Sequence, residues 1–279
     1  MVSGASTMTQ DLYKWIPGRK PLIINVPHAG TFLPADIAQN LTPAGKTVPD
    51  TDWHVDHLYT AAMRMGCAML AATHSRIVVD LNRDPSGAVL YPGASNTELC
   101  PVTTFANEAI YIEGRQPDAF EIERRVRAFW QPYHARLAAE IETIKAKYGF
   151  CILLDAHSIR SSVPRFFAGT LPDLNLGTAD GVSCDPGLAG KVFDVLDAAP
   201  GFTAVRNGRF KGGYITRHYG RPAHDVHALQ LEIGQSCYMD EDNPQPYDAA
   251  ASAPLRGVLG SVTALLLDWQ PPLRAGKAP

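Results

Sequence analysis

Short, continuous apolar segments recur along this chain, and they limit the folds open to it more than any other feature. A strand with one wet face alternates apolar and polar residues, whereas a strand buried on both faces is apolar throughout. The segments here are of the second kind, so we predict a sheet covered on both sides. The expected strands are PLIINV (21–26), CAMLAAT (67–73), RIVVDL (76–81), FCILLDA (150–156), FTAVRN (202–207) and LQLEIG (229–234).

Helical patterns lie between these segments. The strongest covers residues 118–149, with charged residues on one face, apolar residues on the other, and Gly149 at its end. Further helices are expected over residues 54–66, 186–199 and 248–270. The alternation predicts an α/β fold in three layers, with a mixed, mostly parallel central sheet and helices on both faces.

The composition bounds the size and class of the protein. With 279 residues, 46% of them hydrophobic, the chain can bury a full core. We expect one catalytic domain over residues 1–279, with residues 1–19 as a peripheral N-terminal segment. The formal net charge of -3 and the scattered basic residues argue against a nucleic-acid partner. No apolar run approaches the roughly 20 residues that span a bilayer, which argues against a membrane partner.

The cysteines and the N-terminus bear on the compartment. The chain has five cysteines and no C-x-x-C pair, a pattern typical of reduced thiols and not of a disulfide framework. The polar N-terminus lacks the apolar core of a signal peptide. We therefore expect a cytoplasmic protein.

Side chains that can bind ligands or take part in catalysis lie at the ends of four of the predicted strands. His28 comes just after the first, Asn82 and Arg83 after the third, His157 after the fourth, and Glu232 lies within the last. In open α/β sheets, ligands bind at the C-terminal ends of the strands. Burying several ionisable groups near one place costs free energy unless they bind something. The sequence therefore predicts a binding site at this edge of the sheet.

Two histidines and a carboxylate are a common catalytic zinc set, which leaves a fourth position for water. His28 and His157 are the expected nitrogen ligands. The third ligand is expected from the segment VPDTDWHVDHLY. We expect Asp52 to be this ligand, with His54 as its main rival. Asp50 could instead cap the N-terminus of the helix that follows. Zinc is the expected metal, although manganese, iron or cobalt could also occupy such a set.

Glu232 and a group of arginines suggest the reaction and the substrate. A carboxylate beside an activated water can take its proton and pass it to a leaving amine, so Glu232 is the candidate general base. A guanidinium binds a carboxylate through two parallel hydrogen bonds, so several arginines imply a small anionic substrate. The candidates are Arg83, Arg160, Arg165, Arg209 and Arg217.

Several motifs form a specific set between about residue 20 and residue 245. They are NVPHAG, DTDWHVD, RIVVDLNRDPSG, LLDAHSIRSSVPR, PDLNLGT, NGRFKGGYITRHYG and LQLEIGQ. As a set they resemble the N-formylglutamate amidohydrolase family, which is similar to the zinc carboxypeptidases and their phosphorylase/hydrolase-like α/β fold. The resemblance implies hydrolysis of N-formyl-L-glutamate to L-glutamate and formate, the last step of one route from histidine to glutamate.

The resemblance also implies roles for residues at matching positions. The histidines of HAG and DAHS, His28 and His157, would be zinc ligands, and Asp52 would replace the glutamate that zinc carboxypeptidases use. Asn82 and Arg83 are similar to the pair that holds a substrate carboxylate in those enzymes. Glu232 is similar to their catalytic glutamate.

Other functions stay open on the sequence alone. A carboxypeptidase-like or aspartoacylase-like enzyme for another N-acyl amino acid would use the same residues. A binding module that has lost its chemistry is a second alternative. A serine hydrolase using Ser158 is a third, but no G-x-S-x-G elbow is present. The oligomeric state and the role of residues 84–117 are not fixed by the sequence.

Overall fold

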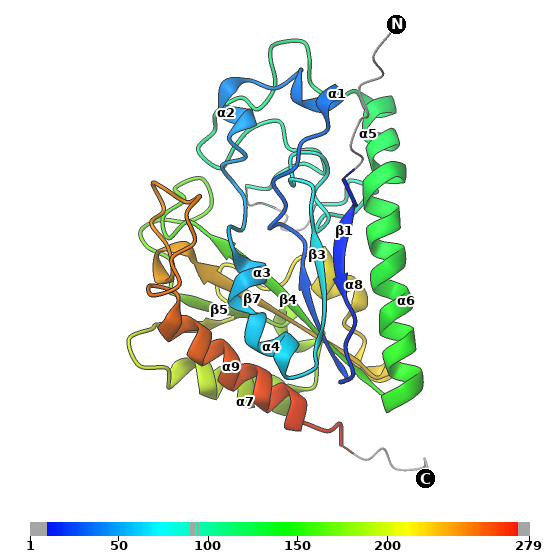
Figure 1. The fold of residues 1–279 in the computed structure, drawn as a ribbon, viewed down its shortest axis with the longest axis vertical. Coiled ribbons are helices and arrows are strands. Elements are labelled where there is room, and N and C mark those ends of the chain that lie inside the picture. Colours follow the sequence, from blue (N-terminus) through cyan, green and yellow to red (C-terminus); the bar gives the residue numbers. More distant parts are fainter. Residues whose placement is uncertain (1–9, 90–92, 94, 273–279) are drawn as a thin grey trace, which may run out of the picture.

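The computed structural model describes residues 10–89, 93 and 95–272 of the chain. Within them, seven strands form one sheet in the order β1-β3-β2-β4-β7-β5-β6, drawn in Figure 1. The long strands β4 and β7 are buried along their whole length. The strands are β1 (Tyr13–Ile16), β2 (Leu22–Val26), β3 (Ala68–Ala72), β4 (Cys151–Ile159), β5 (Leu174–Gly177), β6 (Ala204–Arg206) and β7 (Val226–Gly234).

Most of the strand pairs are parallel. β2 pairs in parallel with β3 and with β4, β4 with β7, and β5 with β6. The pairs β1–β3 and β5–β7 are antiparallel. The mixed, mostly parallel sheet expected from the sequence is therefore confirmed. Because β2, β3, β4 and β7 run the same way, their C-terminal ends meet at one edge of the sheet.

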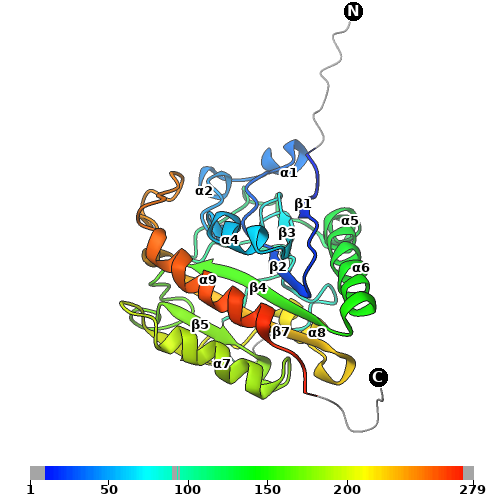
Figure 2. The ribbon, with the colours of Figure 1, turned by 60° about the horizontal axis from the view of Figure 1, so that its bottom comes forward.

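Helices cover both faces of this sheet, as predicted. Side chains of α3, α4, α7 and α9 pack on one face in the largest core cluster, and side chains of α6 and α8 pack on the other. Figure 2 shows α7 and α9 on the side of the sheet away from α6. The helices are α1 (Ala35–Ala38), α2 (Pro43–Lys46), α3 (Val55–Leu58), α4 (Thr60–Arg64), α5 (Ala119–Arg125), α6 (Gln131–Tyr148), α7 (Pro186–Asp197), α8 (Tyr214–Tyr219) and α9 (Ala253–Asp268). No helix in the described ranges is long and apolar enough to cross a membrane.

One predicted strand is wrong. Residues 76–81 form turns and irregular backbone and do not join the sheet. Ile77 and Val78 are nevertheless fully buried, because they pack with Ile37, Leu41 and other side chains in a small separate core. A short apolar run reports burial, and in this loop burial comes without strand pairing.

Two strands were not predicted. β1 lies at the edge of the sheet within the segment expected to be peripheral, and its residues alternate between half-buried and exposed. β5 is a buried run of four residues, too short and too polar at Asn175 to stand out in the sequence.

The long helix predicted over residues 118–149 is interrupted. A π-helical turn, Val126–Trp130, joins α5 to α6. Extra residues of this kind rotate the side chains that follow them and are frequent at functional sites. Here Trp130 Nε1 donates to the carbonyl oxygen of Arg83 (3.1 Å), and His134 Nε2 donates to that of Leu81 (2.8 Å). The turn thus anchors the segment that precedes and includes Arg83.

The turn after β2 requires a glycine. A β-carbon at Gly30 would lie 2.3 Å from the backbone oxygen of His74, closer than any real contact. We predict that Gly30→Ala lowers the free energy of unfolding by about 1–3 kcal/mol, because backbone must move to relieve the clash. Urea unfolding monitored by circular dichroism measures this change.

Gly190 in α7 is the matched control, since a β-carbon there would meet no atom within 4 Å. Gly190→Ala should stabilise the protein by about 0.5–1 kcal/mol through helix propensity. Equal effects of the two substitutions would contradict the close approach at Gly30.

His134 makes stability depend on pH. Burial, only partly offset by its bond to the Leu81 carbonyl, lowers the pKa of His134 to about 4 from the ordinary 6.5. The folded state therefore excludes a proton that the unfolded chain accepts. The contribution of His134 to the free energy of unfolding is fully present above pH 6.5 and is lost as the pH drops toward 4, by up to about 3 kcal/mol.

We predict that His134→Gln flattens this fall in stability between pH 6.5 and 4. Urea unfolding of both proteins across that range measures the two slopes. Identical slopes would show that the proton taken up on unfolding belongs to another group.

Candidate active site

The side chains predicted to form a site meet at the C-terminal edge of the parallel strands. His28 lies two residues after the end of β2, and His157 and Glu232 lie on the neighbouring strands β4 and β7. Asp52 comes from the loop that precedes α3. The expected convergence of these four residues on one cavity is observed.

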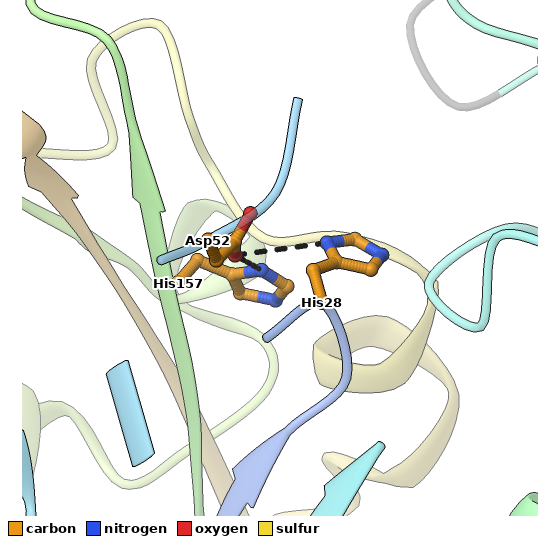
Figure 3. A group of neighbouring side chains, drawn as sticks. All are labelled: His28, Asp52 and His157. Atoms are coloured by element: carbon orange, nitrogen blue, oxygen red, sulfur yellow. Dashed lines mark hydrogen bonds and ion pairs between the residues drawn. The ribbon is translucent and has the colours of Figure 1, made fainter. Parts of the chain in front are cut away.

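Three of these residues form a compact cluster, shown in Figure 3. Asp52 Oδ2 lies 2.9 Å from His157 Nδ1 and 3.7 Å from His28 Nδ1. One donor atom from each residue falls within 4.8 Å of the other two, and all three residues are at most 2% exposed. A carboxylate between two imidazoles is the arrangement expected of a metal site.

The far side of each imidazole is held by a second carboxylate. His28 Nε2 lies 2.7 Å from Asp80 Oδ1, and His157 Nε2 lies 3.2 Å from Asp155 Oδ2. Histidines that bind metals through one ring nitrogen are usually oriented by such a partner on the other nitrogen. In both residues this leaves Nδ1 facing the centre of the cluster.

The Nδ1 atom of His28 is a buried polar atom with no hydrogen-bond partner in the described part of the chain. Leaving such an atom unsatisfied costs about 1–3 kcal/mol. A divalent cation between the three donor atoms would satisfy it, because neutral imidazole nitrogen and carboxylate oxygen both suit zinc. The residues present therefore fit a metal ion.

The charges of the cluster favour a cation. Burial alone would raise the pKa of Asp52, but the hydrogen bond from His157 and the nearby imidazole of His28 outweigh it and lower that pKa. Burial disfavours charge on His157 too, yet Asp155 and Asp52 hold its pKa well above the ordinary value. The site therefore stabilises positive charge, and metal binding would release the proton from the imidazole.

The rival ligands in the same segment lie elsewhere. His54 has a left-handed backbone, and its Nε2 bonds the carbonyl oxygen of Pro244 (2.8 Å). Asp50 is not the cap of the following helix, because its carboxylate accepts from the backbone N–H of Phe105 (3.0 Å). Of the acidic and histidine residues at 50–57, only Asp52 joins the cluster.

Glu232 lines the same cavity and is 7% exposed. Burial raises the pKa of this carboxyl to about 7. Among the described residues, no arginine or lysine forms an ion pair with it, and its carboxylate accepts a hydrogen bond from Gln230 Nε2 at 3.2 Å. A buried acid without a fixed cation, next to a possible metal site, suits proton transfer near neutral pH.

The predicted substrate-binding residues divide into two groups. Asn82, Arg83 and Arg209 line the cavity. Arg160 instead pairs with Asp242 (2.8 Å) at the surface, and Arg217 Nε bonds the carbonyl of Gly212 (2.9 Å). These two lie outside the cavity lining.

Arg165 does not line the cavity but contacts a residue that does. Its Nη1 donates to the Thr103 hydroxyl (2.9 Å) and to the Thr104 carbonyl (2.8 Å), and its Nε contacts the hydroxyl of Ser95 (3.3 Å). Ser95 lines the cavity, so Arg165 supports its wall.

Sequence reasoning missed Arg76, Asp80 and Gln230. Arg76 Nη2 lies 2.6 Å from Asp80 Oδ2, and its Nη1 lies 3.8 Å from Asp52 Oδ1. The signal that could have found the first two was their spacing of four within an apolar run, where charged residues are buried only in pairs. Gln230 could have been found as a polar residue two positions before Glu232 in a buried strand.

Comparison with known proteins agrees with the resemblance seen in the sequence. A family model described as N-formylglutamate amidohydrolase matches residues 20–239. The N-formylglutamate deformylases of Pseudomonas putida and Pseudomonas aeruginosa are 45% and 47% identical over 252 residues, covering 90% of this chain and 94% of each relative.

Solved structures match over most of the chain as well. The crystal structure of N-formylglutamate amidohydrolase from Ralstonia eutropha JMP134 has a TM-score of 0.78 and 30% identity, covering 92% of this chain and 97% of that one. A protein from Agrobacterium tumefaciens, 17% identical with a TM-score of 0.70, shares the fold over 92% of this chain and 95% of that one. The chain belongs to the N-formylglutamate amidohydrolase family.

Proposed function

We propose that this protein is a zinc-dependent amidohydrolase that converts N-formyl-L-glutamate and water to L-glutamate and formate. The observation that carries the proposal is the convergence of His28, Asp52 and His157 beside the buried Glu232. The names of the Pseudomonas relatives supply the substrate. We further propose that the reaction is the last step of a route from histidine to glutamate.

His28 Nδ1, Asp52 Oδ2 and His157 Nδ1 would hold the metal. A bound divalent cation supplies Lewis acidity, which polarises a carbonyl and lowers the pKa of a nearby water. Asp80 and Asp155 orient the two imidazoles so that their Nδ1 atoms face the cation.

Glu232 moves the protons in this mechanism. Its carboxylate takes a proton from the attacking water as the water oxygen bonds to the formyl carbon. The same carboxyl then gives this proton to the glutamate nitrogen when the carbon–nitrogen bond breaks. Burial raises the pKa of this carboxyl, which helps it to hold the proton between the two halves of the transfer.

Arg83 and Arg209 would bind the two carboxylates of the glutamyl part. Both line the cavity, and Arg83 is fixed through hydrogen bonds to the Thr97 hydroxyl (2.8 Å) and the Asn82 carbonyl (3.1 Å). A fixed guanidinium recognises a carboxylate with little loss of entropy. Arg165 acts in this proposal by holding the cavity wall, not by contact with substrate.

The protein would act in the cytoplasm on a small anionic substrate. All five cysteines are free, and four of them are buried, as expected of a protein from a reducing compartment.

We predict that the purified protein releases formate from N-formyl-L-glutamate and that chelation abolishes the release until zinc is added back. N-acetyl-L-glutamate tests the acyl group, and N-formyl-L-norleucine tests the side-chain carboxylate; both should react at least about tenfold more slowly. Fast turnover of the acetyl compound would instead favour a broader N-acyl amino acid hydrolase.

We predict that His28→Gln loses bound zinc, because one of three ligands is removed. Metal content per chain, measured by mass spectrometry after dialysis, reads this out independently of activity. His57→Gln is the control, since the His57 side chain is 55% exposed. Zinc retained at full occupancy in His28→Gln would overturn the proposed ligand set.

We predict that Glu232→Gln lowers kcat by about 10²–10⁴-fold while zinc stays bound, because the proton acceptor is lost and the metal ligands are not. Glu123→Gln in α5, where the side chain is 63% exposed, should keep wild-type turnover. Normal turnover in Glu232→Gln would mean that another group acts as base.

A further inference from the structure

A buried glutamine stands next to the proposed base. Gln230 and Glu232 are two residues apart on β7, so their side chains project from the same face of the sheet. Both line the cavity, and Gln230 is only 3% exposed. Its Nε2 donates to Glu232 Oε2 at 3.2 Å. The glutamine therefore touches one of the two oxygens that would exchange the proton.

The orientation of this amide is fixed by its other end. Gln230 Oε1 accepts a hydrogen bond from the backbone N–H of Gly213 at 2.6 Å. A backbone N–H can only donate, so the atom that faces it must be the amide oxygen. The NH₂ group is thereby turned toward Glu232, where it can donate to a carboxylate.

Gly213 belongs to a turn that needs glycine. A β-carbon at Gly213 would lie 2.3 Å from Asn82 Nδ2, and Gly212 has a backbone φ of +118°. The missing side chains let the start of α8 approach both Gln230 and Asn82. A second backbone N–H at the start of α8 also binds a side-chain amide, because that of Ile215 donates to Asn82 Oδ1 at 2.8 Å.

We propose that Gln230 is a positioning residue for the reaction: oriented by the N–H of Gly213, it holds the Glu232 carboxylate in the geometry that proton transfer requires. The inference rests on the proposed function, in which Glu232 is the base. The hydrogen bond restricts the carboxylate to one rotamer and favours its ionised form.

A purely structural role explains less. A buried amide in a central strand costs free energy unless both ends are bonded, so an apolar residue would serve packing better. The two ends of Gln230 are bonded to the turn before α8 and to Glu232, not to neighbouring strands. The amide thus links the turn to the base.

The test is Gln230→Met, which keeps the length of the side chain and removes both amide atoms. We expect kcat for N-formyl-L-glutamate to fall about 10- to 100-fold with KM changed less than about twofold and zinc content unchanged. In a Glu232→Gln background, the same substitution should cause no further loss, because the group that it positions is gone.

Gln235 is the matched control, because it is equally buried at 3% and bonds Thr51 (2.9 Å) and Ser158 (3.4 Å) instead. Loss of turnover in Gln235→Met should add to that in Glu232→Gln. If Gln230→Met does not fold, Gln230→Asn replaces it in the double-mutant comparison with Glu232→Gln. Its side chain keeps the amide but is too short to reach both partners.

The outcomes separate the two proposals. Normal turnover in Glu232→Gln would overturn the proposed function. An impaired Glu232→Gln together with a fully active Gln230→Met, or with losses that add in the double variant, would overturn the positioning role alone.

Discussion

The parallel register between β4 and β7 is the constraint on which the site depends. It places Asp155 beside Gln230 and His157 beside Glu232. Because side chains alternate along a strand, all four project from one face of the sheet. The proposed ligand His157, the proposed base Glu232 and Gln230 therefore line one cavity, and Asp155 lies behind His157 as its orienting carboxylate. A slip of one residue in either strand would turn that strand's pair toward the opposite core. Such a slip is disfavoured because it would bury these polar and charged side chains in an apolar core, which costs free energy.

The buried charges explain why the site is built around a cation. Asp52, Asp80 and Asp155 are each at most 1% exposed, and carboxylates are stable in such places only when paired or hydrogen-bonded. Arg76 pairs with Asp80 (2.6 Å), and Asn25 donates to Asp155 (2.8 Å). Asp52 accepts from the backbone N–H of Ser158 (3.2 Å) and faces the imidazoles of His157 (2.9 Å) and His28 (3.7 Å). A divalent ion there would complete the charge balance without any rearrangement of the fold.

The sequence was sufficient for the centre of the site and for the layers of the fold. His28 and Glu232 could be placed because parallel strands bring their C-terminal ends to one edge, a rule that needs only the order of the elements. Residues 76–81 were misassigned because a buried loop and a buried strand have the same apolar pattern. Asp80 lies within this segment, so its contact with His28 could not be predicted either. Arg160 lies outside the cavity lining because a long side chain on a loop is positioned by tertiary contacts, here with Asp242, which no local pattern encodes.

The loop that carries Asn82 and Arg83 shows how irregular backbone can still hold side chains with the accuracy that catalysis needs. It is bonded from one side by Trp130 at the π-helical turn and from the other by the N–H of Ile215 at the start of α8. The first bond fixes the Arg83 carbonyl, and the second orients the Asn82 amide so that its Nδ2 faces Asp155 Oδ2 (3.5 Å). A strand would have given the same rigidity but would have pointed alternate side chains away from the cavity. A loop clamped by two helices lets consecutive residues, Asn82 and Arg83, both line it.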